Sequence, residues 1–315
     1  MRIVILDAAA ISNNDVSFAP IQALGETILY DDTPKELVVE RIRDADCVMS
    51  NRTPLREDVL KQAPRLKWIG TFSTGYNQVD IDAAKRLGIV VSNVPHYSTG
   101  AVAQMTFSLL LELAMHVGDF NTAVQNGVWQ RDGVRAMWHC PMTELAGKTM
   151  GIIGFGSIGG AVARLALAFD MNVLAYSRTP KPGQVPFVSL DELLTKSDVV
   201  SLHLPLSDET RGLISADRIA KMKKNAFFIN TARGPIVDEQ ALADALNAGR
   251  IAGAAVDVVS REPIRDDNPL LTAKNCIITP HVAWAPIETR VRLVSLVAQN
   301  LAAFLAGSPI NVVNP

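Results

Sequence analysis

The stretch that decides the fold runs from Gly147 to Arg178 and reads GKTMGIIGFGSIGGAVARLALAFDMNVLAYSR. A short apolar run leads into a glycine-rich turn, an alanine-rich run of helical spacing and a second apolar run. This order predicts strand, turn, helix and strand, the unit that holds a dinucleotide pyrophosphate at a helix N-terminus. The alternative is an ordinary glycine-rich turn in an α/β core. The strand–helix–strand context favours nucleotide binding.

The turn itself supplies the first candidate cofactor contacts. Its three glycines predict a tight turn, a close approach of backbone to phosphate, and close packing of helix on strand. The residues of the turn that we expect to bind the cofactor are Gly154, Phe155, Gly156, Ser157, Ile158 and Gly159.

The end of the second strand bears on the choice of cofactor. NAD-binding units usually carry an acid there, about 20 residues on, which binds the ribose 2′-hydroxyl. Here the place holds Ser177, Arg178 and Thr179. No carboxylate lies there to repel a 2′-phosphate, and the guanidinium of Arg178 is placed to pair with one. We therefore expect NADP rather than NAD. The alternative is a solvated Arg178 and an NAD that lacks its usual anchor.

Composition limits the class of protein. The 315 residues are enough for two domains, and 48% apolar with 20% charged residues indicates a globular protein with ample core. A net charge of −2 gives no support for a nucleic-acid partner or an anionic membrane surface. Cys47, Cys140 and Cys276 form neither a metal pattern nor a disulfide framework, which favours a reducing cytoplasm and no metal.

Neither a signal peptide nor a membrane span is predicted. The N-terminus is too short and strand-like for a signal peptide. The longest apolar stretch, Ala101 to Met115, contains Gln104 and Glu112 and falls short of the roughly 20 residues that a bilayer requires. A buried helix is the better interpretation.

The first 94 residues alternate apolar strands with helical segments. Strands are expected at 3–6, 46–49, 66–70 and 88–92, which predicts a parallel sheet covered by helices. Ligands of such sheets lie beyond the carboxyl ends of the strands. The loops 50–53 and 71–76 are therefore candidate binding loops, although ordinary polar turns fit them equally well. Small residues and a glycine in the second loop suit anion binding by backbone N–H groups.

The remaining chain predicts a second domain and an arm. Residues 119–146 show little periodicity, and their apolar content favours an irregular arm that buries itself against another subunit. Six strands between 147 and 279 complete a doubly wound domain, and a final helix from 286 to 306 precedes a tail that folds back on the N-terminal part. We expect a substrate domain of residues 1–98 and 287–315, and a dinucleotide-binding domain of residues 99–286, with a cleft between them.

Three charged or titratable residues follow strand ends in the second half: Arg233, Glu262 and His281. Alone, each is explained as a surface arginine, a loop carboxylate or a capping histidine. Because the carboxyl ends of parallel strands share one edge with the glycine turn, we expect all three to face the cleft at that edge.

Together these motifs resemble the D-isomer-specific 2-hydroxyacid dehydrogenases over essentially the whole chain. The resemblance rests on the glycine turn, His203-Leu204-Pro205-Leu206, residues 230–234, residues 257–263 and Pro280-His281. It implies two doubly wound parallel-sheet α/β domains, a Rossmann domain and a flavodoxin-like substrate domain. It also implies catalytic roles for Arg233, Glu262 and His281. Further residues implied in binding are Asn51, Ser73, Thr74 and Gly75 for the substrate, and Pro205, Thr210, Thr231, Ala232 and Asp257 for the cofactor.

The implied chemistry requires no metal. Reduction of a 2-oxo acid needs a hydride at C2 and a proton at its oxygen, and His281 is the expected acid because the neighbouring Glu262 favours its imidazolium. Arg233 has two parallel donors for the substrate's carboxylate and carbonyl oxygens.

Within the family, the chain is most similar to glyoxylate/hydroxypyruvate reductases (glycerate dehydrogenases). D-lactate and other D-2-hydroxyacid dehydrogenases, formate or phosphonate dehydrogenases, and a cofactor-sensing binding protein like the related corepressors are the alternatives. The arm resembles the family's dimerisation arm, which implies a homodimer through residues 100–146. Trp138 either reaches a neighbouring subunit's site or packs for dimer stability alone.

Overall fold

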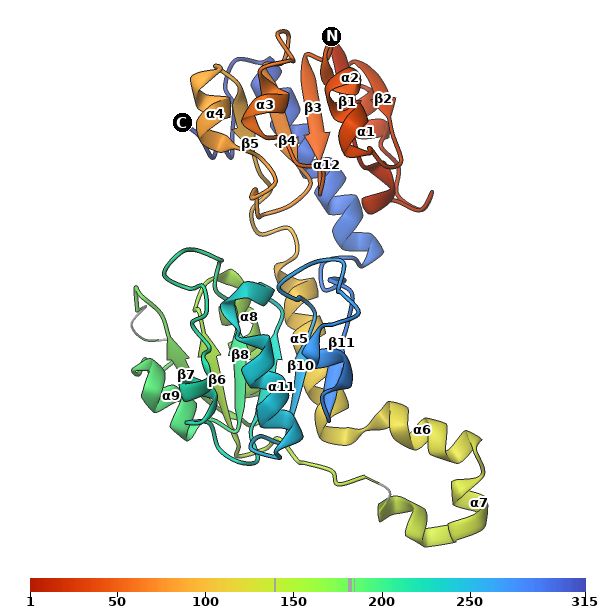
Figure 1. The fold of residues 1–315 in the computed structure, drawn as a ribbon, viewed down its shortest axis with the longest axis vertical. Helices are drawn as coiled ribbons and strands as arrows, with labels where there is room; N and C mark the ends of the chain where they lie inside the picture. Colours follow the sequence, from red (N-terminus) through yellow and green to blue (C-terminus); the bar gives the residue numbers. More distant parts are fainter. Residues whose placement is uncertain (139, 181–182, 184) are drawn as a thin grey trace. The chain divides into compact units, whose positions relative to one another are not determined.

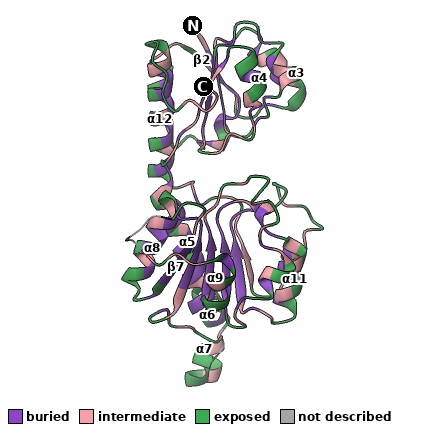
Figure 2. Ribbon diagram, turned by 90° about the vertical axis from the view of Figure 1, so that its left-hand side faces the viewer, coloured by how far each residue is buried: buried purple, intermediate pink, exposed green. Residues whose placement is uncertain are grey.

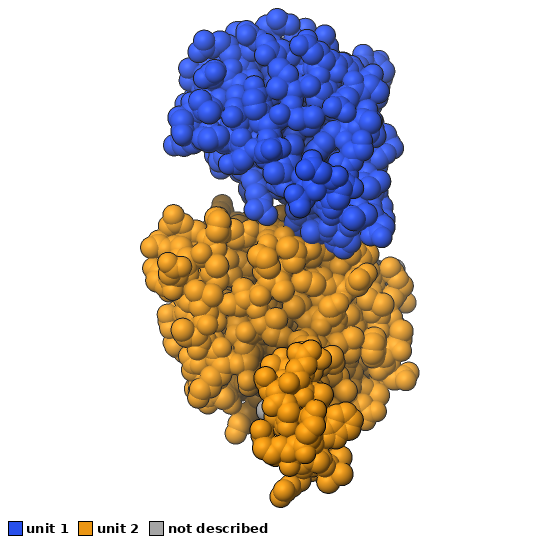
Figure 3. Space-filling model, turned by 90° about the vertical axis from the view of Figure 1, so that its right-hand side faces the viewer, with its two compact units in different colours: residues 1–98, 284–315 blue, residues 99–283 orange. Residues whose placement is uncertain are grey.

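The chain folds into two compact units. The computed structural model describes residues 1–138, 140–180, 183 and 185–315. Unit 1 consists of residues 1–98 and 284–315, and unit 2 of residues 99–283 (Figure 3). The return of the chain to unit 1 comes slightly before residue 287, where the sequence places the boundary. Each unit contains one parallel sheet, as predicted from the alternation of strands and helices.

Unit 1, all of whose residues are described, is built on a five-stranded parallel sheet of order β2-β1-β3-β4-β5 (Figure 1). The strands are β1 (Arg2–Ile5), β2 (Glu26–Leu29), β3 (Cys47–Ser50), β4 (Trp68–Thr71) and β5 (Val90–Ser92). In register, Ile3 lies between Thr27 of β2 and Cys47 of β3. The order is that of flavodoxin-like folds, as expected. The prediction missed β2, a half-exposed edge strand without a strong apolar run.

Helices cover both faces of this sheet. They are α1 (Ala19–Gln22), α2 (Val38–Ile42), α3 (Glu57–Leu60), α4 (Ile81–Arg86) and α12 (Ile287–Leu305), with the 3-10 turns η1 (Ala8–Ala10) and η2 (Lys35–Leu37). On one face α12 buries Leu293, Val297 and Leu301 against Trp68. The tail beyond α12 lies along β5, where Val313 N–H donates to the Val91 carbonyl at 2.9 Å. The expected return of the tail to the N-terminal part is confirmed.

The described residues of unit 2 form a six-stranded parallel sheet of order β11-β10-β9-β8-β6-β7. The strands are β6 (Thr149–Ile153), β7 (Asn172–Tyr176), β8 (Val199–Leu202), β9 (Phe227–Asn230), β10 (Gly253–Val256) and β11 (Cys276–Ile278). Phe187, which belongs to no strand, forms a single parallel bridge with Ala175 of the edge strand β7. The chain winds outward from β6 to β7 and then restarts at β8 on the other side of β6. The switch point, where a Rossmann sheet binds its ligand, therefore lies between β6 and β8.

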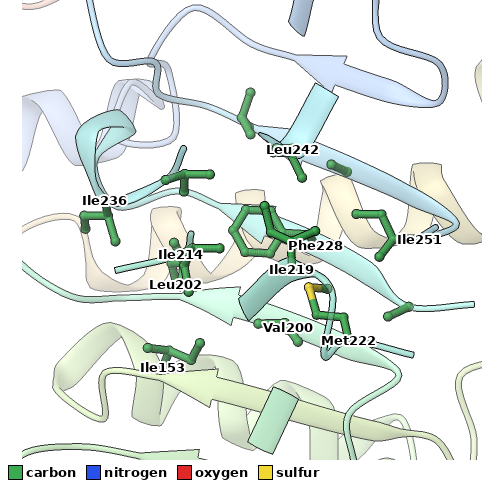
Figure 4. Packing of buried hydrophobic residues seen from close by; sticks show 14 of the residues in the cluster. Ile153, Val200, Leu202, Ile214, Ile219, Met222, Phe228, Ile236, Leu242 and Ile251 are labelled. Carbon is green, nitrogen blue, oxygen red and sulfur yellow. The ribbon is translucent and has the colours of Figure 1, made fainter. Parts of the chain in front are cut away.

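Helices pack on both faces of the unit 2 sheet (Figures 1 and 2). They are α5 (Thr99–Met115) and α8 (Ser157–Ala168) on one face, and α9 (Leu190–Lys196), α10 (Ala216–Ile219) and α11 (Glu239–Asn247) on the other, with η4 (Gly234–Ile236) and η5 (Pro269–Thr272). Alternation along the strand sends Ile152 to the α5–α8 core and Ile153 to the α9–α11 core. Figure 4 shows the second core around Phe228. Full burial of each such side chain contributes about 1.5–3 kcal/mol.

The arm is helical, which corrects the prediction of an irregular segment. It contains α6 (Val117–Gln125), α7 (Val128–Asp132) and the 3-10 turn η3 (Gly133–Trp138), and α6 and α7 extend away from the unit 2 sheet (Figure 1). The residue before α6, His116, has a left-handed backbone (φ 51°) and no side-chain cap, so the usual start signal for a helix is absent.

No single helix among the described residues is both long and apolar enough to cross a membrane; α5 and α6 meet that test only as a pair bent by 55°. The side chains of Phe107, Leu110 and Leu113 on α5 are buried in the unit 2 core. The predicted buried helix at 101–115 is thus confirmed.

Candidate active site

The glycine turn connects β6 to α8 at the switch point. Gly154 has φ +99°, and a Cβ on it would lie 2.5 Å from the His203 carbonyl oxygen. A Cβ on Gly159 would lie 2.2 Å from the Gly154 carbonyl oxygen, so α8 packs directly on the turn. Within the described part of the chain, a Cβ on Gly156 would meet no atom within 4 Å. The turn is therefore tight on its inner side and open at Gly156, where α8 begins, and this shape fits a dinucleotide pyrophosphate.

The other predicted cofactor residues near the turn differ in accessibility. Phe155 is buried, with its ring 5.3 Å from that of Phe187, so only its backbone belongs to the turn surface. Ser157 is exposed and Ile158 half-buried at the start of α8. Beyond β8, the Thr210 hydroxyl donates to the Pro205 carbonyl at 2.8 Å. That bond closes a turn over residues 205–210.

The end of β7 contains a contact that the sequence did not predict. Arg178 Nη1 donates to Glu209 Oε2 at 3.0 Å. The expectation that no carboxylate is available near Arg178 is therefore wrong. Glu209 comes from the turn after β8, far along the chain from the position beside Ser177 where an acid was sought.

The loop after β9 positions Arg233. Asn230 fixes the loop from within, since its Nδ2 donates to the Arg233 carbonyl and its Oδ1 accepts from Ala232 N–H, both at 3.0 Å. Arg233 is half-buried, and its Nη1 donates to the Ala232 carbonyl at 2.7 Å. Thr231 is buried, with its hydroxyl 3.2 Å from that of Thr106 on α5. The backbone at Gly234 lies against that of Val259, so this loop packs against the segment that carries Glu262.

Glu262 and His281 form a hydrogen-bonded pair. His281 Nδ1 lies 2.6 Å from Glu262 Oε2, with both side chains about one-third exposed (30% and 38%). Burial raises the pKa of the Glu262 carboxyl, but the hydrogen bond and charge of His281, with Val259 N–H and the charge of Arg233, bring that pKa below its ordinary value. Glu262 is thus an anion near neutral pH, oriented on one ring nitrogen of His281. The other ring nitrogen, Nε2, takes no part in this pair.

A buried aspartate holds the loop that carries His281. Asp257 follows β10 and accepts hydrogen bonds from the Thr279 hydroxyl at 2.6 Å and from Val282 and Ala283 N–H at 2.9 Å. His281 has a left-handed backbone (φ 55°) between these anchors. The resemblance implies that Asp257 lies near the nicotinamide. The structure adds an anchoring role, which an acid directly after a buried strand could have suggested.

His203, which the sequence also singles out, is a different kind of histidine. Its Nε2 lies 2.9 Å from the Ser201 hydroxyl, and its buried Nδ1 has no hydrogen-bond partner among the residues that the structure describes. Burial lowers the pKa of His203 to about 3. A neutral imidazole is a poor proton donor near pH 7, so His281 remains the candidate acid.

The predicted substrate residues lie in two adjacent loops of unit 1, after β3 and β4. Asn51 Nδ2 donates to the Phe72 carbonyl at 2.7 Å and ties the loops together. The hydroxyl of Ser73 donates to the Gly75 carbonyl, and that of Thr74 to the Val94 carbonyl at 2.8 Å. These side-chain groups are thus engaged within unit 1.

A buried carboxylate, which the sequence did not single out, organises the first of these loops. Asp7 follows β1 and accepts from Asn51 N–H and Arg52 N–H at 2.8 Å, and from Thr53 N–H at 2.9 Å. The hydroxyls of Ser50 and Thr53 donate to it at 3.0 Å. Its oxygens are saturated by the loop 50–53.

One further cluster of titratable groups lies at the base of the arm. Ligand-type atoms of His116, Asp119 and Cys140 lie within 4.8 Å of one another. His116 Nδ1 is 3.2 Å from Asp119 Oδ2, a hydrogen bond that accounts for their approach without an ion. Burial, followed by the charge of Asp119, raises the pKa of the Cys140 thiol, which keeps it protonated.

The comparison with known proteins identifies the family. Residues 107–283 match the family model described as D-isomer specific 2-hydroxyacid dehydrogenase, NAD binding domain. The chain belongs to this family. The match confirms the resemblance seen in the sequence and the assignment as an oxidoreductase.

Individual relatives are similar over their full length. The chain is 48% identical to a hydroxypyruvate reductase from Blautia hydrogenotrophica, with 100% of both chains covered. An NADPH-dependent glyoxylate/hydroxypyruvate reductase from Sinorhizobium meliloti has a similar structure (TM-score 0.88, 30% identity, 100% of this chain and 98% of that chain covered). So does a D-lactate dehydrogenase from Aquifex aeolicus, solved with NAD and lactic acid (TM-score 0.87, 30% identity, 100% and 99% covered). The predicted pair of α/β domains is that of these dehydrogenases.

Proposed function

We propose that this protein reduces small 2-oxo acids, glyoxylate and hydroxypyruvate above all, to glycolate and D-glycerate. The observation that carries the proposal is the pair of His281 and Glu262 beside Arg233, in a unit with a dinucleotide-binding turn. The hydroxypyruvate reductase that is 48% identical over the whole chain supports this choice of substrate.

His281 is the acid of the proposed reaction. The nicotinamide, when bound, supplies the hydride for C2 of the substrate. His281 Nε2 gives its proton to the carbonyl oxygen as that oxygen gains charge, while Nδ1 stays bound to Glu262. The Glu262 carboxylate stabilises the protonated ring before transfer and keeps it oriented. In the oxidation of a hydroxy acid, the same nitrogen accepts the proton.

Substrate orientation is assigned to Arg233 and to the loops of unit 1. The Arg233 guanidinium pairs with the carboxylate and the carbonyl oxygen of the substrate, which polarises the bond and fixes the face that receives the hydride. Backbone N–H groups at Ser73, Thr74 and Gly75 bind the rest of the carboxylate charge, and Asn51 borders the same loop. Neutral donors suffice here because Arg233 supplies the balancing charge.

The cofactor is held by backbone at the glycine turn and selected at the end of β7. Gly154 to Gly159 bind the pyrophosphate, and Pro205, Thr210, Thr231, Ala232 and Asp257 line the rest of the dinucleotide. Ser177, Arg178 and Thr179 bind the adenosine ribose. We favour NADPH, because Arg178 is an exposed guanidinium suited to a 2′-phosphate.

The test is a spectrophotometric panel of NADPH and NADH against glyoxylate, hydroxypyruvate, pyruvate and phosphohydroxypyruvate. We expect the highest kcat/KM with hydroxypyruvate or glyoxylate. A preference for pyruvate would instead support a D-lactate dehydrogenase, and cofactor binding without turnover of any substrate would support a cofactor-sensing binding protein.

A cytoplasmic homodimer completes the proposal. The arm exposes large apolar side chains, with Trp129 62%, Val134 76% and Trp138 76% accessible, and such a surface is typical of a subunit interface. Sedimentation velocity should give about twice the chain mass of 34.0 kDa. A monomer at micromolar concentration would contradict the dimer.

A further inference from the structure

The pair formed by Arg178 and Glu209 bears on cofactor choice. Arg178 follows β7, at the strand end where the ribose of a bound dinucleotide lies in this fold. Its Nη1 donates to Glu209 Oε2 at 3.0 Å. Both side chains are largely accessible, at 86% and 74%, so the pair is open to a ligand from solvent.

Glu209 is presented by a closed turn rather than by a loose loop. Ser207 N–H donates to the Thr210 hydroxyl at 2.8 Å, and that hydroxyl donates to the Pro205 carbonyl at 2.8 Å. Arg211 N–H donates to the Ser207 carbonyl at 3.0 Å. The backbone on both sides of Glu209 is therefore fixed, and its carboxylate is directed to the end of β7.

The two members of the pair favour different cofactors. A 2′-phosphate pairs with the Arg178 guanidinium but is repelled by a carboxylate beside it. A ribose 2′-hydroxyl, in contrast, can donate a hydrogen bond to that carboxylate. Because an exposed ion pair contributes at most about 1 kcal/mol, either ligand can open it.

We propose that Glu209 replaces the acid missing beside Ser177, as the acceptor for the 2′-hydroxyl of NADH, and that its pairing with Arg178 sets the ratio of NADPH to NADH affinity. Glu209 then limits the NADPH preference that Arg178 confers. The inference rests on the proposed function only in requiring a nicotinamide dinucleotide at the glycine turn.

The test is direct cofactor titration, by protein fluorescence and calorimetry, without any 2-oxo acid. We expect Glu209→Gln to bind NADPH about three- to fivefold more tightly and NADH about three- to fivefold more weakly than wild type, a size typical of exposed charge contacts. Arg178→Ala should weaken NADPH about tenfold and leave NADH within about twofold. In the double variant, the effect of Glu209→Gln on NADPH should shrink, because no guanidinium remains to be released.

Glu192→Gln is the matched control, since Glu192 on α9 is a partly exposed carboxylate paired with Lys196 at 2.6 Å. Its NADPH to NADH ratio should equal that of wild type. An unchanged ratio in Glu209→Gln, or an equal change for both cofactors, would overturn the inference. If the wild-type protein bound neither cofactor, the proposed function would be overturned instead. If the wild-type protein bound cofactor but did not reduce any 2-oxo acid, only the proposed reduction and the assignments of catalytic residues would be affected.

Discussion

Asp7 in unit 1 and Asp257 in unit 2 are two buried aspartates with the same local task. Each follows a buried strand, and each is saturated by donors from a neighbouring loop. The loops that they hold differ. The loop on Asp7 carries Asn51, whose neutral amide donates to the Phe72 carbonyl within unit 1. The loop on Asp257 carries His281, a titratable side chain held by Glu262.

This difference separates binding from chemistry. A loop of backbone N–H groups can recognise a carboxylate without changing its own charge. A loop with a histidine and a glutamate can move a proton, provided that the pair is well oriented. The comparison predicts that damage in unit 1 alters mainly KM and damage in unit 2 alters mainly kcat.

The largest effect is expected from removal of the acid. His281→Ala should lower kcat for 2-oxo acid reduction about 10²- to 10⁴-fold, the range usual for general acid catalysis, while NADPH binding stays near wild type. Steady-state kinetics with cofactor titration checks this. Retention of more than a tenth of the activity would exclude His281 as the acid.

A smaller loss of kcat is expected when the anchor of the His281 loop is weakened. Asp257→Asn replaces one acceptor oxygen by an amide that faces N–H groups, so the loop shifts and kcat should fall about 10- to 100-fold. The pH dependence of the residual activity should keep its wild-type shape, because the pair of Glu262 and His281 is intact. A change confined to KM would contradict the anchoring role.

Asp7→Asn tests the other side of the comparison. Loss of acceptors for Asn51, Arg52 and Thr53 should raise KM for hydroxypyruvate about tenfold and lower the free energy of unfolding by about 2–3 kcal/mol, with kcat within about threefold. Asp58→Asn, an exposed carboxylate on α3, is the control and should leave both unchanged. If Asp7→Asn lowered kcat far more than it raised KM, the separation of roles would fail.

The smallest effect is a shift in pH dependence. In Glu262→Gln the ring of His281 loses its anionic partner, so the alkaline limb of the kcat profile for reduction should move to lower pH. The folded pKa of Glu262 lies below its ordinary 4.5, so its stabilising contribution is present above that pH and lost as the pH falls through the folded value. Unfolding measured between pH 3 and 6 should therefore be less pH-dependent in the variant. An unchanged alkaline limb would contradict the pairing.

Much of this arrangement could be predicted because it depends on local sequence. The glycine turn, the strand ends before Arg233 and His281 and the final helix are all marked by short-range patterns. Elements without such patterns were missed. β2 is a half-exposed edge strand, and α6 begins at a left-handed His116 with no capping side chain. Periodicity and capping, on which the predictions relied, are weak at both places.

The contacts that could not be predicted join residues far apart in the chain. Glu209, in the turn after β8, is hydrogen-bonded to Arg178, which follows β7 and lies 31 residues earlier in the chain. Asp7, at the end of β1, holds residues 50–53, which follow the end of β3. Sequence spacing contains no information on such distances until the order of strands is known. That order also explains why the ends of β6 and β8 meet at the glycine turn.

The position of α12 has a consequence for synthesis on the ribosome. Leu293, Val297 and Leu301 complete the core of unit 1 around Trp68, although most of that unit is translated before residue 99. Unit 2 is a continuous segment and can fold once residue 283 has left the exit tunnel. Unit 1 is therefore translated first but completes its folding last. Its incomplete core stays accessible to chaperones until α12 has been synthesised.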